Sequence, residues 1–234
     1  LVPPVEPPHV RGELLADETD YSMGWTLADV SPPAAVIIEY SLDDGQTWIE
    51  IDAQAGFETS PASYEWTVPD VAGDITECRV RITAVDEAGV ALGKTGEGEG
   101  HYTQVISGTF TIYDSPAAPT NVVGEDPDST EAGVDWRDFG ATWTTSPSLG
   151  VVKQEVYLLP GDVVALDLEG AEPDVPIATF DNRTTAAWVS TEALSADSSG
   201  AVLAEGQYKI WIVVTDGAGR TAVASSQAFA ATAP

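Results

Sequence analysis

One strand-like segment occurs twice in the chain and limits the folds open to it. Residues Cys78–Gly89 and Tyr208–Gly219 both alternate apolar side chains along their length, and both end in Asp-x-Ala-Gly. A period of two places one set of side chains on the buried face of a strand, and the glycine suits a hairpin turn. The predicted buried sets are Cys78, Val80, Ile82 and Ala84 in the first copy, and Tyr208, Ile210, Ile212 and Val214 in the second. We therefore expect two copies of one β domain.

Other predicted strands recur in the same order around these two segments. Each half has an early strand with a central Trp and a closing strand with a central Phe. The early strands are Ser22–Leu27 around Trp25 and Gly140–Thr144 around Trp143, and the closing strands are Gly108–Tyr113 around Phe110 and Ser226–Ala230 around Phe229. A proline-containing linker, residues 114–119, lies between the halves. We expect a proline-rich extended arm or linker over 1–10, one domain over 11–115 and a second over 116–234.

The fold class follows from these short alternating runs, which are separated by clusters of Gly, Pro, Asp and Ser. Such a pattern predicts an all-β chain with two tandem immunoglobulin-like β-sandwiches. The order of elements resembles immunoglobulin-like and fibronectin type III-like domains of microbial surface and secreted proteins. The paired cysteines of antibody-type domains are missing, because Cys78 is the one cysteine of the chain. The resemblance implies a spacer, an adhesive module or a building block of a larger assembly, and it implies no enzymatic activity.

The net charge of the chain restricts the classes of partner that it can bind. There are 38 acidic residues against nine Lys and Arg, which gives a formal net charge of -29. Such a surface repels phosphate backbones and anionic lipids, so we expect no nucleic-acid partner and no insertion into a membrane. An acidic, lysine-poor surface fits a saline or calcium-rich exterior, and an ordinary solvated acidic surface remains the alternative. The chain begins at Leu1 without a leader, which indicates a mature form or an excerpt of a longer protein.

The sharpest local motif is Ser41–Trp48 (SLDDGQTW), which resembles the S-x-D-x-G-x-T-W Asp-box of sialidase-like propellers. Asp44-Gly45 suits a two-residue hairpin turn with positive φ. Asp43 is expected to accept backbone N–H groups across that turn, and Trp48 is expected to cover its base. A propeller enzyme needs several blades and several copies of the motif. A structural hairpin is therefore favoured over glycoside hydrolysis.

Candidate ligand and modification sites are few. No cofactor is expected, although calcium is possible at an acidic segment that departs from the EF-hand pattern. Cys78 is predicted to be a buried, inert thiol, and neither His9 nor His101 has further metal ligands nearby in sequence. The candidate calcium ligands are Asp126, Asp128 and Glu131; Asn182 begins a possible N-glycosylation sequon; and Asp197–Gly200 is predicted to be a simple turn.

Two features predict association. Trp211 and Val213 alternate with the buried set of their strand and are expected to face outward, where a Trp often marks an interface, although a long loop would cover them equally well. The arm offers Leu1, Val2, Val5 and Val10 as interface residues in an extended, polyproline II-like segment. An interdomain linker is the alternative interpretation of the arm.

The functional expectation is a non-catalytic structural or adhesive subunit of an extracellular assembly at the cell surface, such as a surface layer, a filament or an adhesin. Its partners would be further copies of the chain or neighbouring surface subunits. Two alternatives stay open. One is a carbohydrate-binding or spacer portion of a secreted hydrolase, which a cluster of exposed aromatic side chains would favour. The other is a virion decoration or fibre protein.

Overall fold

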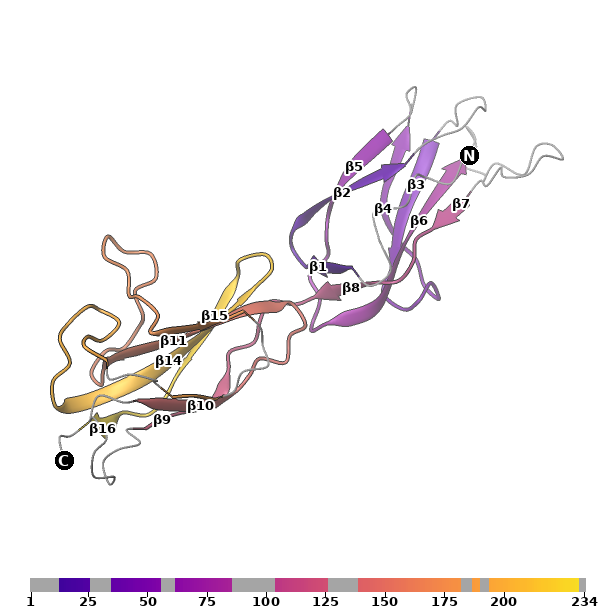
Figure 1. Cartoon of the computed structure of the whole chain (residues 1–234). Coiled ribbons are helices and arrows are strands. Elements are labelled where there is room, and N and C mark those ends of the chain that lie inside the picture. Colours follow the sequence, from indigo (N-terminus) through magenta and orange to yellow (C-terminus); the bar gives the residue numbers. More distant parts are fainter. Residues whose placement is uncertain are drawn as a thin grey trace. The chain divides into compact units, whose positions relative to one another are not determined.

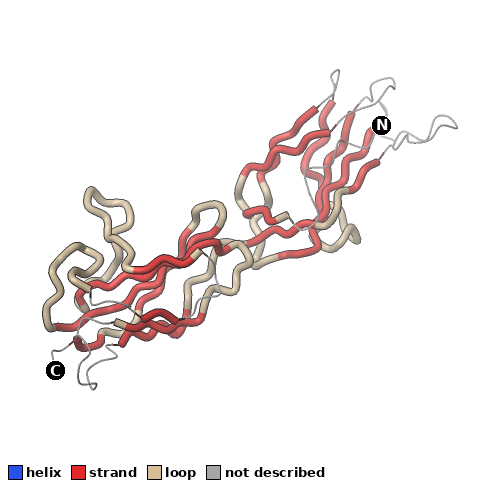
Figure 2. Tube along the Cα trace, viewed as in Figure 1, coloured by secondary structure: helices blue, strands red, loops and turns tan. Residues whose placement is uncertain are grey.

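The computed structural model describes residues 13–25, 35–55, 62–85, 104–125, 139–181, 187–189 and 194–231. These residues form strands joined by turns and loops, and none of them is helical (Figure 2). In this part of the chain there is accordingly no helix with the length and apolarity that a membrane crossing requires. The chain divides into two compact units, residues 1–114 (unit 1) and residues 115–234 (unit 2). The division falls within the proline-containing segment 114–119.

Unit 1 consists of two sheets (Figure 1). Its strands are β1 (Leu14–Ala16), β2 (Asp20–Trp25), β3 (Ala35–Ser41), β4 (Ile49–Ala55), β5 (Ala62–Thr67), β6 (Ile75–Val85), β7 (Gln104–Ile106) and β8 (Phe110–Tyr113). The larger sheet has the order β1-β8-β6-β3-β4, with β7 also paired to β6, and the smaller sheet is β2-β5. Strand β1 runs parallel to β8, whereas the other pairs are antiparallel.

The core of unit 1 lies between these two sheets. Val36 and Ile38 of β3 face inward with the alternate residues of β6, and Met23 and Trp66 come from the smaller sheet. The Trp66 ring lies 5.6 Å from the ring of Tyr40 and makes an edge contact with Phe110. Aromatic pairs at such distances add to the free energy gained from apolar burial. Trp66 of the smaller sheet thus contacts aromatic rings of two strands of the larger sheet, within a core to which both sheets contribute.

Unit 2 is also built from two sheets. Its strands are β9 (Thr120–Glu125), β10 (Gly140–Thr144), β11 (Val151–Pro160), β12 (Ala178–Phe180), β13 (Ala187–Val189), β14 (Gly206–Asp216), β15 (Thr221–Ser225) and β16 (Phe229–Ala231). One sheet has the order β12-β11-β14-β15, with β16 also paired to β14, and the other is β13-β10-β9. In the core, the Nε1–H of Trp143 donates to Oε1 of the fully buried Gln154 at 3.0 Å, so the indole is buried with its polar group satisfied.

Each unit is an immunoglobulin-like β-sandwich, and the two share the pairing of five strands, whereas the first strands differ: β1 pairs with β8 in the larger sheet, and β9 pairs with β10 in the smaller sheet. In chain order, β2, β3, β4, β5 and β6 of unit 1 correspond to β10, β11, β12, β13 and β14 of unit 2. At the start of β14, the Tyr208 hydroxyl donates to the Ala204 carbonyl at 2.9 Å and accepts from the Ala204 N–H at 3.1 Å. A tyrosine tied to backbone just upstream is a corner motif of immunoglobulin-like sandwiches. The predicted fold class is confirmed.

The closing strand is interrupted by a serine in the same way in both units. In unit 1, Ser107 N–H donates to the Val80 carbonyl at 2.8 Å, and Ser107 Oγ accepts from the Val80 N–H at 2.9 Å. In unit 2, Ser226 makes the same two bonds to Ile210, at 2.8 and 3.0 Å. Each hydroxyl then donates to the next carbonyl of its own strand at 2.7 Å. The serine side chain thus replaces one backbone group of the ladder where the strand changes register.

The buried faces predicted for the two repeated strands are confirmed residue by residue. All eight side chains predicted to be buried in the two copies are buried. The early strand of unit 2 has the predicted bounds, Gly140–Thr144, whereas that of unit 1 begins earlier, at Asp20. The closing strands begin later than predicted, at Phe110 and Phe229, because the serine interruption precedes each of them.

Candidate functional site

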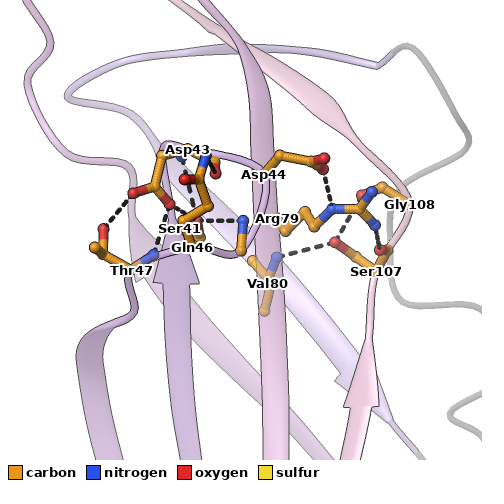
Figure 3. Close-up of polar contacts among 10 residues, drawn as sticks. Ser41, Asp43, Asp44, Gln46, Thr47, Arg79, Val80, Ser107 and Gly108 are labelled. Carbon is orange, nitrogen blue, oxygen red and sulfur yellow. Dashed lines mark hydrogen bonds and ion pairs between the residues drawn. The ribbon is translucent and has the colours of Figure 1, made fainter.

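The Ser41–Trp48 loop joins β3 to β4 and is held by its own side chains (Figure 3). The Asp43 carboxylate accepts from the Thr47 N–H at 2.8 Å, the Thr47 hydroxyl at 2.6 Å and the Ser41 hydroxyl at 2.7 Å. These bonds, the one from the Thr47 hydroxyl above all, lower the pKa of Asp43 to about 2. Asp43 therefore stays ionised and fixes the loop at all but the most acidic pH values.

The turn itself lies at Asp44-Gly45, as predicted. Both residues have positive φ, 57° and 86°, and the Gln46 N–H donates to the Asp43 carbonyl at 3.2 Å. Two central residues with positive φ are what a type I′ turn requires. The prediction of a two-residue hairpin is wrong in one respect, because the turn lies inside a longer loop: strand pairing ends at Tyr40 and Ile49. The side-chain bonds of Asp43 close the extra residues.

Arginines of β6 attach this loop to the larger sheet. Arg79 Nε lies 2.5 Å from the Asp44 carboxylate, and its Nη1 donates to the Ser107 carbonyl at 3.0 Å (Figure 3). Arg81 binds Glu39 with two bonds, at 2.6 and 2.7 Å, and its guanidinium carbon lies 4.2 Å from the centre of the Trp48 ring. A bidentate pair of this kind is geometrically specific, and stacking on the indole adds a cation–π contact.

The two aspartates of the motif bind groups of this protein. Asp43 binds groups of its own loop, and Asp44 binds Arg79 and the Glu77 carbonyl, the latter through its N–H at 2.8 Å. Glycoside hydrolysis needs two carboxyl groups at a fixed separation across a substrate cleft. The geometry here supports the hairpin interpretation, in which the motif connects β3, β4, β6 and the serine of the closing strand.

Trp211 and Val213 do not face solvent, and the prediction that they do is wrong. They are only 8% and 1% exposed. With Tyr157 and Leu159 they form a second apolar cluster on the outer face of the β11–β14 sheet. The loop between β11 and β12, residues 161–177, covers this cluster with Val163, Leu166 and Leu168. The alternation of β14 is real, but both of its faces are buried.

Polar contacts hold the covering loop closed on itself and on the sheet. The Asp174 N–H donates to the Asp167 carbonyl at 2.7 Å, and the Asp174 carboxylate accepts from the Asp167 N–H at 2.8 Å. Lys209 Nζ donates to the Val163 carbonyl at 3.0 Å. Under the loop, burial raises the pKa of Tyr157 to about 12, and the charges of Glu155 and Asp174 act in the same direction. These contacts give the loop a structural role.

The remaining predicted sites fall into two groups. The thiol of Cys78 is buried, and burial raises its pKa to about 11, so the side chain is protonated and unreactive at neutral pH. Asp197–Gly200 forms the predicted turn, in which the Asp197 carboxylate accepts from the Ser199 and Ala201 N–H groups. The other candidates lie outside the described residues: Leu1, Val2, Val5, His9, Val10, His101, Asp126, Asp128, Glu131 and Asn182. Within the described residues, no group of three or more His, Cys, Asp or Glu side chains is placed to hold a metal ion.

Sequence reasoning missed the two serines of the closing strands, and it named a long loop over Trp211 only as the alternative, without saying which loop. A signal was present for the serines, because Ser-x-x-Phe occurs both at Ser107–Phe110 and at Ser226–Phe229. The loop had a weaker signal, the apolar residues Leu166 and Leu168 within an acidic stretch. Charged residues around them made that stretch indistinguishable from a solvated loop.

Comparison with known proteins adds little to this description. No protein-family model matches the chain, and no curated protein matches it. Among solved structures, the chain is similar to a marsupial T cell receptor at 9% sequence identity, with a TM-score of 0.28. The match covers 93% of this chain and 60% of that one. The fold assignment therefore depends on the strand order of the two units themselves.

Proposed function

We propose that this chain is a non-catalytic structural or adhesive subunit of an extracellular assembly, such as a surface layer, a filament or an adhesin. The observation that carries the proposal is the tandem repetition of one sandwich, with the same serine interruption in both closing strands. A repeated module lengthens a chain without adding new chemistry. The best-formed polar site, the Ser41–Trp48 loop, likewise uses its charged side chains to hold its own fold.

Charge supports a saline exterior as the setting. The chain carries a net charge of -29, and three of its residues are lysines. At about 1 M salt the Debye length falls to roughly 3 Å, so copies of such a chain can approach one another without strong repulsion. Among the described residues, the exposed large apolar side chains are all aliphatic. An aromatic sugar-binding platform would need exposed rings instead.

Electron microscopy of the purified full chain tests the proposal. We expect polymers, lattices or fibres in molar NaCl and dispersed particles in low salt, because salt screens the repulsion between acidic copies. Particles that remain single at every salt concentration and every protein concentration would contradict an assembly subunit.

The proline-rich arm, residues 1–10, is one predicted route of assembly. Proline restricts the arm before it docks, so less conformational entropy is lost on binding. We expect deletion of residues 1–9 to weaken assembly in light scattering while both unfolding transitions stay unchanged. A matched variant, in which serine replaces Leu1, Val2 and Val5 and the prolines remain, separates apolar contacts from chain length. Equal assembly by the truncated and intact chains would contradict a role for the arm.

A further inference from the structure

Among the described strands, β15 has a partner on one side of its backbone only. It lies at the edge of its sheet and pairs with β14 (Figure 1). Two bonds fix the alternation at its ends: Ser226 N–H donates to the Ile210 carbonyl at 2.8 Å, and Asp216 N–H donates to the Arg220 carbonyl at 3.0 Å. Residues of an antiparallel pair alternate between facing the partner strand and facing away. The backbone groups of Ala222 and Ala224 therefore bond to β14. The backbone groups of Thr221, Val223 and Ser225 point away from β14.

Other edge strands carry features that discourage pairing with another chain. Charged side chains, short length and bulges are such features. Among the described strands, the edge strands β2, β4, β5 and β9 contain the acids Asp20, Glu50, Asp52, Glu65 and Glu125, and β1, β7, β12, β13 and β16 have three residues each. β15 has five residues, no charge and no proline, and its register with β14 is regular. It is the described edge with the least protection.

Charge around β15 also differs from the rest of the chain. No Asp or Glu occurs from Gly217 to Pro234, the longest such stretch in a chain with 38 acidic residues. The one charged residue within it, Arg220, lies 2.7 Å from the Asp216 carboxylate. A second copy of an acidic chain meets its smallest repulsion at such a strip. The strip thus suits a partner that is itself acidic.

We propose that β15 pairs antiparallel with β15 of a second copy of this chain, about a two-fold axis at Val223. Val223 then lies opposite its own counterpart, and Thr221 lies opposite Ser225 of the other copy. All three positions present both an N–H and a carbonyl to the open side, so one self-complementary pairing satisfies every free group. The β12-β11-β14-β15 sheet of one copy and the same sheet of the second copy then form one continuous sheet, a form of strand addition. The inference rests on the proposed function, for which it supplies one contact between subunits.

Proline at Val223 tests the pairing with little effect on the fold. Val223→Pro removes an N–H that points away from β14, and edge strands tolerate proline at such positions. In sedimentation at molar NaCl we expect the wild-type chain to dimerise, and we expect Val223→Pro to weaken the dimer about tenfold or more. Val223→Thr, which keeps the backbone N–H, should dimerise like the wild type. The unit 2 unfolding transition of each variant shows that its sandwich is intact.

A cysteine at the same position tests the register. Opposite residues of a hydrogen-bonded antiparallel pair have Cα atoms about 5.5 Å apart, within reach of a disulfide or a short thiol crosslinker. We expect Val223→Cys to form a covalent dimer in molar salt. Val202→Cys, at a side chain that is 83% exposed and lies outside β15, should not. Cys78 is buried and does not interfere.

The outcomes separate this inference from the proposed function. If Val223→Pro dimerises as tightly as the wild type, or if Val202→Cys crosslinks as well as Val223→Cys, the β15 pairing is wrong while the assembly proposal stands. If the dimer disappears on deletion of residues 1–9 while β15 is intact, the dimer contact depends on the arm and the β15 pairing is again wrong. A β15-dependent dimer that never forms larger particles supports the pairing and contradicts the assembly. A wild-type chain that stays monomeric overturns both.

Discussion

At the scale of single residues, the Ser41–Trp48 loop depends on one aspartate and one glycine. The Asp43 carboxylate accepts three hydrogen bonds, two from Thr47 and one from Ser41. Gly45 supplies a backbone conformation, φ of 86°, that residues with a side chain rarely adopt. A Cβ at this glycine would also lie 3.1 Å from the Trp48 ring. The loop therefore allows little substitution at position 45.

Gly45→Val is expected to destabilise unit 1 by about 1–3 kcal/mol, since a β-branched residue is strained at positive φ. Chemical denaturation of the full chain, in which the unit 1 transition is followed separately, measures the loss. Gly45→Asn is the matched control, because asparagine tolerates the left-handed region better and should lose less. Equal stability of the valine variant and the wild type would show that the loop can adopt another turn.

At the scale of elements, the two closing strands use one device at two places. Ser107 and Ser226 each accept from a buried backbone N–H that would otherwise lack its ladder partner. The cost of leaving a buried donor unsatisfied exceeds the gain from an average hydrogen bond. The hydroxyl is therefore required by the break in register of the strand.

Ser107→Ala should lower the stability of unit 1, and Ser226→Ala that of unit 2, each by about 1–3 kcal/mol. Calorimetry of the full chain resolves the two effects if each variant moves one transition and leaves the other in place. Ser225→Ala, at an exposed neighbouring position, should move neither. A serine variant that shifts both transitions would mean that the two units do not unfold independently.

The covering loop of unit 2 is a second element whose role can be measured. Leu166 packs on the cluster around Trp211, whereas Val164 of the same loop is 89% exposed. Leu166→Ala should therefore cost about 1 kcal/mol of unit 2 stability, given about 0.8 kcal/mol per fully buried methylene and the partial burial of this side chain. It should also shift the total tryptophan emission of the chain to longer wavelength, because the Trp211 indole becomes more exposed to water. Val164→Ala should change neither quantity, and equal effects of the two variants would contradict the packing of Leu166.

At the scale of the whole molecule, net charge dominates. The net charge of -29 is distributed over both halves of the chain, and the repulsion between like charges favours the expanded unfolded chain. The melting temperature should therefore rise as NaCl increases from low to molar concentration, because screening weakens this repulsion. KCl at equal ionic strength should give the same rise. A melting temperature that is constant or falls across this range would remove the argument for a saline setting.

Local patterns in the sequence determined much of this protein. Alternation with a period of two depends on neighbouring residues alone, so the buried residues of β6 and β14 and the turn at Asp44-Gly45 were predictable. The sandwich class followed from the spacing of such strands. The calcium site predicted at Asp126 and the glycosylation site predicted at Asn182 lie outside the described residues and stay predictions.

Only the tertiary structure decided what covers each strand. Alternation defines two faces of β14, but it does not say whether a distant loop returns to bury the second one. Trp211 is buried because Leu166 and Leu168, far away in sequence, pack on it. The open edge of β15 likewise depends on which strands pair in the sheet, and the serine interruption depends on a break in register between paired strands. These features arise from contacts between distant segments, whose geometry no local pattern specifies.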